Sequence, residues 1–183
     1  MKTLKTLLSA FALVALTATS AMAQGQASIT ASANVVTDVT LTGVRGLDFG
    51  TLLDGDVDAG VTEALSTANE ANLGKFQMTS LASSQDIVLT LSAPANLTPE
   101  GTPDLSGGTA QDDIPFTATA TYTETDGDVD GGSDFTGGTV SVTTGGATST
   151  AYVYVGGTLN SGAAAGNYQG QYSGDVTLSV YYD

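Results

Sequence analysis

The 183-residue sequence predicts an all-β protein with an immunoglobulin-like antiparallel β-sandwich fold. Apolar residues alternate with Ser and Thr along most of the chain, with the period of two that half-buried strands require. Stretches rich in glycine and aspartate separate these runs and have the composition of turns. After the N-terminal leader no segment has a convincing helical period, and the length suits one domain.

Residues 1–23 have the composition of a secretory signal peptide. Lys2 and Lys5 precede a short apolar stretch, and Ala21–Ala23 supplies the small residues of a cleavage site. The apolar stretch is shorter than the roughly 20 residues that span a bilayer. We therefore expect an exported, secreted protein without a membrane span, whose mature chain begins at Gln24.

Charge and composition exclude several classes of function. The chain has 19 acidic residues against 4 basic ones, and such a surface repels nucleic acid and anionic lipid. It has no Cys and no His, so disulfides, the Ser-His-Asp triad and the usual zinc sites are excluded. Two-carboxylate glycoside hydrolysis remains chemically open. However, the acids lie mainly in turn-like stretches and Trp is absent, so we do not expect an enzyme.

Several segments in the middle of the chain have the alternation of strands with one apolar face. Residues 61–74 could hold a helical turn, but their charges and small side chains favour a loop. The expected apolar faces are, in chain order, Phe76 and Met78; Ile87, Leu89 and Leu91; Ile114, Phe116, Ala118, Ala120 and Tyr122; Val140 and Val142; and part of the run 151–155.

The N-terminal stretch from Ala27 to Leu41 alternates over more residues than the usual strand of about 5–6. Three interpretations are open: a long strand that changes sheets, two strands broken at Asn34–Asp38, or an extension that belongs to a neighbouring molecule. In the last case residues 24–35 are a candidate donor strand and residues 36–183 form a single domain. The inserted face would consist of Ala27, Ile29, Ala31 and Ala33.

The C-terminal segment 168–183 has the most regular alternation in the chain and predicts one continuous strand. A strand of this kind buries one face and exposes the other to water. Its even positions form the expected buried face: Tyr168, Gly170, Tyr172, Gly174, Val176, Leu178, Val180 and Tyr182.

On this segment the chain resembles the subunits of bacterial chaperone–usher pili and the related spore coat protein U. The last strand of these subunits carries a penultimate Tyr, a Gly fourteen residues from the end, and alternating apolar residues between them. Here Tyr182 and Gly170 stand at those positions, with Val176, Leu178 and Val180 between them. The chain is also similar to the secreted bacterial family called domain of unknown function 4402, in the segments Leu47–Leu53, Gly74–Ser80, Asp86–Thr98 and Val155–Asp183.

The resemblance implies a structural subunit of an extracellular or cell-surface filament, that is, a pilus or fimbria. In such subunits a missing strand leaves a groove, and the N-terminal extension of a neighbour fills it as a donor strand. Copies of this chain would then form a head-to-tail homopolymer, with a periplasmic chaperone and an outer-membrane usher as further partners. The alternative is a monomeric secreted or periplasmic sandwich that binds glycan or calcium.

Two acidic loops have the spacing of calcium ligands. In the later loop, alternate aspartates followed by glycine could aim several hard oxygens at one ion, as calcium requires. Gly137 stands where an EF-hand needs Glu, so an EF-hand is excluded. A solvated turn explains the same residues, because turns select Asp and Gly. The candidate ligands are Asp126, Asp128, Asp130 and Asp134.

The earlier loop is a weaker candidate for the same structural Ca²⁺, the one cofactor that the sequence suggests. It carries Asp54, Asp56 and Asp58, but Ala59 stands where the sharp turn of a calcium loop requires Gly.

Overall fold

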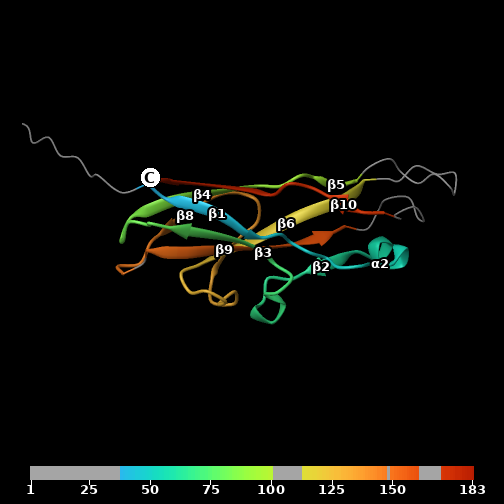
Figure 1. Cartoon of the computed structure of the whole chain (residues 1–183), viewed down its shortest axis with the longest axis horizontal. Helices are drawn as coiled ribbons and strands as arrows, with labels where there is room; N and C mark the ends of the chain where they lie inside the picture. The colour runs from blue at the N-terminus through green and yellow to red at the C-terminus, as the bar shows by residue number, and fades with distance from the viewer. Residues whose placement is uncertain (1–37, 101–112, 148, 161–169) are drawn as a thin grey trace, which may run out of the picture. The chain divides into compact units, whose positions relative to one another are not determined.

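The computed structural model describes residues 38–100, 113–147, 149–160 and 170–183, and its strands form two antiparallel sheets packed face to face (Figure 1). Val36–Asp183 form one compact unit. The all-β sandwich predicted from the sequence is therefore confirmed. The expected signal peptide and donor strand lie outside the described residues. Within the described ranges, no helix is long and apolar enough to cross a membrane.

The larger sheet contains eight strands and the smaller one three. The main path of the larger sheet is β1 (Thr40–Arg45), β3 (Gly74–Thr79), β9 (Thr150–Leu159), β6 (Ile114–Thr123), β5 (Asn96–Pro99) and β10 (Tyr172–Ser173). Two short strands join it at the side: β2 (Val61–Glu63) pairs with β9, and β7 (Ser133–Phe135) pairs with β6. The smaller sheet has the order β11 (Thr177–Tyr182), β4 (Asp86–Ser92) and β8 (Gly138–Thr143).

The main core lies between the sheets and is built from the alternating faces that the sequence predicted. On β4 the inward side chains Ile87, Leu89 and Leu91 are all buried. Fully burying one such side chain contributes roughly 1.5–3 kcal/mol, so the alternation itself fixes which face turns inward. On β6 the same holds for Ile114, Phe116, Ala118, Ala120 and Tyr122.

A second, smaller core lies on the outer face of the larger sheet. Its buried residues are Leu73, Val129 and Tyr154, with Leu65 and Tyr152 packed against them. Leu65, Leu73 and Val129 lie outside the strands, so the segments around 64–73 and 124–132 fold over β3 and β9. These segments include the later acidic loop, which is therefore part of the packed structure.

Two short helical segments replace loops expected from the sequence. The earlier acidic loop forms α2 (Asp54–Ala59), in which Val57 is buried in the main core. The carboxylate of Asp56 accepts a hydrogen bond from the backbone amide of Leu53 at 3.1 Å, which satisfies one donor at the start of the helix. A 3₁₀ turn, η1, covers Thr67–Asn69.

The prediction of one continuous strand over residues 168–183 is wrong, because the chain changes sheets between Ser173 and Thr177. Tyr172–Ser173 pair with β5 in the larger sheet, whereas Thr177–Tyr182 pair with β4 in the smaller one. A Cβ atom on Gly174 would lie 2.7 Å from Cγ of Pro94 and 3.0 Å from Cδ2 of Leu97 in β5, so a side chain at this bend would force its neighbours to shift. The inward face after the bend was predicted correctly: Leu178 is buried, and Val180 and Tyr182 pack against the core.

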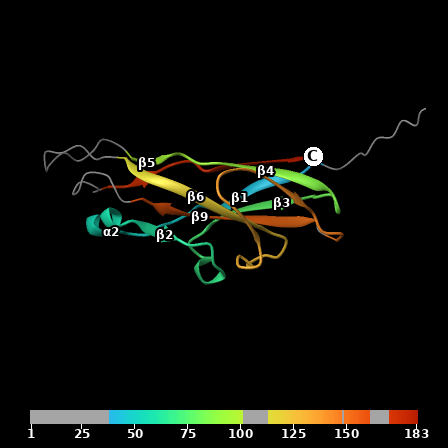
Figure 2. The same ribbon diagram turned by 180° about the vertical axis from the view of Figure 1, so that it is seen from behind.

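The register of the strands places the start of β1 and the end of β11 at the same end of the sandwich. Thr40, at the start of β1, pairs with Thr79, and Tyr182, at the end of β11, pairs with Ile87. The β3–β4 connection joins their partners, so both ends lie at what we call the C-terminal pole. Figures 1 and 2 show the C-terminus beside the start of β1 and α2 at the opposite end. We call this opposite end the groove pole, after the groove described in the next subsection.

Candidate functional site

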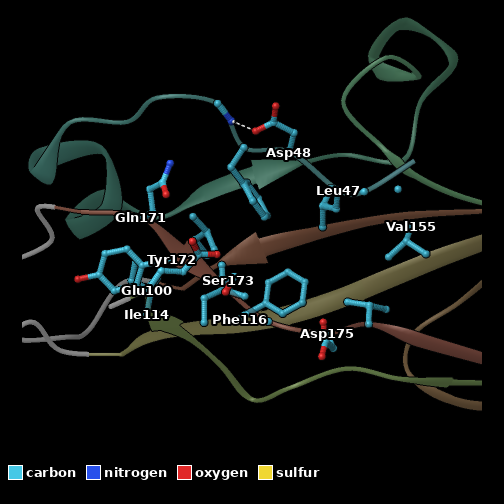
Figure 3. A pocket seen from close by; sticks show the side chains of 18 of the residues that line it. Leu47, Asp48, Glu100, Ile114, Phe116, Val155, Gln171, Tyr172, Ser173 and Asp175 are labelled. Atoms are coloured by element: carbon cyan, nitrogen blue, oxygen red, sulfur yellow. Dashed lines mark hydrogen bonds between the residues drawn. The ribbon is translucent and has the colours of Figure 1, made fainter. Parts of the chain in front are cut away.

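A groove with a cavity volume of about 860 Å³ opens toward the groove pole. One wall is residues 43–52, which include the end of β1 and the segment after it. The other wall is residues 170–176, which include β10 and the bend into β11. Figure 3 shows Leu47 and Asp48 on one wall and Gln171, Tyr172 and Ser173 on the other, with Phe116 between them.

The floor of the groove is the inner face of the larger sheet, and it is apolar. Its side chains come from β3, β5, β6 and β9, and several of them belong to the buried core of the sandwich. An occupant of the groove would therefore add its own side chains to this core. The floor residues are Phe76, Leu97, Ile114, Phe116, Val155 and Leu159.

The first wall alternates between inward apolar and outward polar residues. Leu47 and Phe49 are half-buried and pack against the main core. The ring of Phe49 meets that of Phe116 edge to face, with centroids 6.1 Å apart and planes at 88°. Between them, Asp48 is exposed and its carboxylate accepts a hydrogen bond from the amide of Gly50 at 2.8 Å. Gly50 has φ 69°, a conformation that glycine adopts at low cost.

The strands β1 and β10, whose residues line the groove, stand at the two ends of the larger sheet. Within the described ranges β1 pairs with β3 alone and β10 pairs with β5 alone. Each therefore presents a free edge whose main-chain groups can pair with an added strand. An apolar floor between two open sheet edges is the geometry that strand addition requires.

The residues expected in a pilus-like C-terminal strand divide into two groups. Gly170 and Val176 line the groove. Leu178, Val180 and Tyr182 instead close the core toward the C-terminal pole, where the Tyr182 hydroxyl accepts a hydrogen bond from the amide of Ala82 at 2.7 Å. The expected donor residues Ala27, Ile29, Ala31 and Ala33 lie outside the described residues.

The carboxylates of the later acidic loop have separate protein partners. Asp126 contacts Lys75 and Tyr154, Oδ1 of Asp128 accepts from the amide of Gly131 at 3.0 Å, and Oδ2 of Asp130 accepts from the amide of Thr67 at 3.2 Å. Asp134 lies in β7, opposite Thr121 of β6. The residue between the aspartates, Val129, is only 2% exposed and anchors the loop in the smaller core.

No cluster of three or more His, Cys, Asp or Glu residues that could hold a metal appears among the residues that the structure describes. In the earlier loop, the carboxylate of Asp56 is used at the start of α2. In both segments, backbone amides donate hydrogen bonds to the aspartate carboxylates, and these bonds favour a structural role for the carboxylates. Calcium binding stays a prediction.

Lys75 is the basic residue around which the later loop is organised. Its ammonium group pairs with Asp126 and lies 4.9 Å from the ring centroid of Tyr152 and 3.9 Å from Oε1 of Glu70. Burial by itself would lower the pKa of Lys75, but hydrogen bonds to Asp126 and Tyr154 outweigh it and raise the pKa. The same contacts, first from Lys75 and then from Tyr154, lower the pKa of Asp126.

Arg45 stabilises the neighbouring segment in a similar way. Its guanidinium donates to the backbone carbonyls of Leu73, at 2.8 Å, and of Glu70, and forms an ion pair with the Glu70 carboxylate at 2.9 Å. Sequence reasoning did not identify these contacts. The available signal was that Arg45 and Lys75 are the sole basic residues after the leader, in a chain with 19 acids.

Comparison with protein-family models and with curated proteins finds no match for this chain.

Proposed function

We propose that this protein is a structural subunit of an extracellular or cell-surface filament of a bacterium and that it polymerises by β-strand addition. The observation that carries the proposal is the groove between residues 43–52 and 170–176, with its apolar floor and the edge strands beside it. No catalytic role is assigned to any residue.

The N-terminal extension has the composition that such a groove accepts. Its inserted face would be Ala27, Ile29, Ala31 and Ala33, while Ser and Thr on the other face stay in water. Burying Ile29 would contribute roughly 1.5–3 kcal/mol. Main-chain hydrogen bonds to an open sheet edge would add to the affinity. Because the donor and acceptor surfaces differ, the contact is head-to-tail and repeats without closing.

Export is part of the same proposal. A subunit with an open apolar groove exposes aggregation-prone surface until a neighbour covers it. A periplasmic chaperone and an outer-membrane usher are partners that would protect and order such subunits. Mass spectrometry of the exported protein should show a chain that starts at Gln24, and extracellular material that retains Met1 would contradict the proposed cleavage.

Deletion of residues 24–34 tests strand addition directly. The truncated subunit should remain β-rich by circular dichroism but form no filaments in negative-stain electron microscopy. Ile29→Asp should have the same effect, because an unpaired carboxylate would have to enter an apolar groove. Thr30→Ser, on the wet face of the same strand, is the matched control and should polymerise normally. Normal filaments from the deletion variant would rule out donation by this segment.

A second candidate function is a monomeric secreted or periplasmic module that binds glycan or calcium. The polar rim of the groove favours it, since Asp48, Glu100, Gln171 and Asp175 surround the opening with hydrogen-bonding groups. A purely monomeric peak in size-exclusion chromatography, together with saturable glycan or calcium binding in calorimetry, would support this alternative over the filament.

A further inference from the structure

The strand β8 (Gly138–Thr143) stands at one end of the smaller sheet. Among the described strands it pairs with β4 alone, and none of its residues lines the groove. Its free edge is therefore a second surface to which a strand could be added, separate from the groove of the proposed function.

The edge of β8 lacks the features by which edge strands usually avoid pairing with another chain. Such strands are often charged, bulged or interrupted by proline. The segment GTVSVT has no charged residue and no proline. It pairs with β4 in unbroken register, from Thr143 opposite Asp86 to Gly138 opposite Leu91. The edge is thus regular and uncharged, in a chain with 19 acidic residues and 4 basic ones.

The main-chain groups of alternate residues in β8 point away from β4. The amide of Thr144, directly after β8, donates to the carbonyl of Gln85 at 2.9 Å, so the even-numbered residues of this segment face β4. In an antiparallel ladder the residues between them have their amide and carbonyl groups on the other side. Thr139, Ser141 and Thr143 therefore present main-chain donors and acceptors to the open edge.

The sequence of this edge is symmetric about Ser141. In either direction, residues 139–143 read Thr-Val-Ser-Val-Thr. In an antiparallel pair with a two-fold axis at Ser141, this serine would meet its own copy, and Thr139 would meet Thr143 of the second copy. Valines would then meet on the inner face and hydroxyl groups on the outer face. The strand at the other end of the same sheet, β11, has the sequence TLSVYY and no such symmetry.

The two valines of β8 have apolar surface left to bury. Val140 and Val142 lie opposite Leu89 and Ile87, which are 0% exposed. The valines pack against the same core but are only partly buried. A second β8 would bring its own valines beside them, and the loss of apolar surface to water favours the association.

We infer that β8 is a self-pairing edge, through which two copies of this chain join their smaller sheets antiparallel about Ser141. The contact is isologous and closes as a pair. It does not depend on the proposed function, because a monomeric binding module would carry the same edge. In a filament it would join subunits of neighbouring filaments side by side.

Repulsion between the two acidic copies is weak in this arrangement. Asp86 is the sole charged residue in the three strands of the smaller sheet, and its carboxylate accepts a hydrogen bond from the Thr143 hydroxyl at 2.5 Å. The two copies of Asp86 would be separated by four residues along the strands and three strand spacings across them, about 20 Å in all. This separation is about twice the Debye length at 0.1 M salt, so solvent ions screen the pair.

A single engineered cysteine tests the pairing, because the chain has no cysteine of its own. Opposite residues of a hydrogen-bonded antiparallel pair have Cα atoms about 5.5 Å apart, within the roughly 4.4–6.8 Å that a disulfide spans. Ser141→Cys should therefore convert most of the mature protein to a covalent dimer under mild oxidation. Ser92→Cys, at an exposed position of β4 in the same sheet, is the matched control and should stay monomeric.

The products are separated on heated, non-reducing denaturing gels, which report the disulfide whether or not filaments are present. Negative-stain images of the same preparations record filaments independently.

Two further variants test the symmetry. Thr139→Cys and Thr143→Cys should each stay monomeric alone, since two copies of one position would be offset by about 13 Å along the strands. Mixed in equal amounts, they should cross-link to each other. Ser141→Lys added to both should abolish this mixed dimer, because two ammonium groups would meet at the axis. Ser92→Lys added to both should leave it intact.

Three results would contradict the inference. The first is a Ser141→Cys protein that stays monomeric after oxidation. The second is an equal dimer yield from Ser141→Cys and Ser92→Cys, which would show random collision. The third is a self-linked dimer of Thr139→Cys or Thr143→Cys without the mixed dimer, which would place the axis elsewhere. A Ser141→Cys dimer without filaments from the unmodified mature protein would remove the proposed function and leave this inference standing.

Discussion

The hydroxyl group of Tyr154 donates a hydrogen bond to Oδ1 of Asp126 at 2.7 Å and accepts one from the backbone amide of Gly127, also at 2.7 Å. The Tyr154 ring is fully buried in the smaller core, and Lys75 reaches the same carboxylate from β3. The Tyr154 side chain of β9 thus binds the acidic loop at two points, the backbone amide of Gly127 and the carboxylate of Asp126. The loop with the strongest resemblance to a calcium site is fixed by protein contacts.

Tyr154→Phe should destabilise the protein by about 1–3 kcal/mol, because it removes one hydrogen bond to a charged group and leaves the amide of Gly127 without this acceptor. The ring and its packing are retained, so the change isolates the hydroxyl. Urea unfolding monitored by circular dichroism measures the difference in free energy, with an unchanged m-value. Tyr181→Phe is the matched control, since Tyr181 is 55% exposed on β11, and its effect should stay within about 0.5 kcal/mol.

The Lys75–Asp126 pair should make stability depend on pH in two ranges. The pKa of Asp126 is lowered in the folded state, so its contribution is present above the ordinary value of 3.8 and is lost as pH falls through the folded pKa. The pKa of Lys75 is raised, so its contribution is present below 10.5 and is lost as pH rises through the folded pKa.

The free-energy difference between wild type and Asp126→Asn should therefore be constant from roughly pH 4 to pH 10 and shrink outside this range. Its size should be small, because the Asp126 side chain is 56% exposed and solvent screens the pair. Urea midpoints across the pH range provide the measurement. A difference that persists undiminished at pH 2 would show that the carboxylate charge is not what stabilises the loop.

Gly132→Ala should destabilise the protein by about 1–3 kcal/mol through overpacking. A Cβ atom at this position would lie 2.8 Å from the carbonyl oxygen of Tyr122 and still closer to the hydroxyl of Thr121, both on the rigid strand β6. Gly146→Ala is the matched control, because its Cβ would meet Ser84 at an ordinary 3.7 Å. Thermal unfolding of the two variants should separate them by several degrees, and equal melting temperatures would contradict the close packing of this loop.

A calcium titration distinguishes the two interpretations of the later acidic loop. A bound ion would raise the melting temperature of the wild type, and Asp128→Asn with Asp130→Asn would remove most of the shift. Equal responses of wild type and double variant would instead leave these carboxylates with the hydrogen bonds that they accept from Gly131 and Thr67 as their structural role. A calcium-dependent shift confined to the wild type would establish the site.

Strand faces were predictable because burial on a pleated strand follows position parity. Ile87, Leu89 and Leu91 could be assigned to the core from alternation alone, since shifting the strand by one residue would expose all three. The groove as a kind of site was also expected, from the resemblance of the C-terminal segment to pilus subunits. The wall formed by residues 170–176 was not expected, because the segment leaves the larger sheet after Ser173 and joins the smaller sheet at Thr177, and these pairings involve residues distant in the sequence.

The helix α2 and the contacts of Lys75 could not be read from the sequence for a similar reason. Asp-Gly repeats favour turns locally, and it is the burial of Val57 in the main core that fixes a helical turn there. The pairing of Lys75 with Asp126 joins residues 51 positions apart. Such contacts follow from the register of β3, β9 and β6, which a single sequence does not determine.

A synthetic peptide corresponding to Gln24–Asn34 should bind the subunit that lacks this segment and stabilise it. At a peptide concentration 100 times the dissociation constant, preferential binding to the folded state contributes about 2.7 kcal/mol, or a rise in melting temperature of roughly 5–10 °C for a domain of this size. The Ile29→Asp peptide should give no rise, because its carboxylate would have to be buried against Phe116 and its neighbours without a partner. The Thr30→Ser peptide should act like the natural sequence. Equal stabilisation by the natural peptide and the Ile29→Asp peptide would mean that the extension binds by its charge or backbone outside the apolar groove.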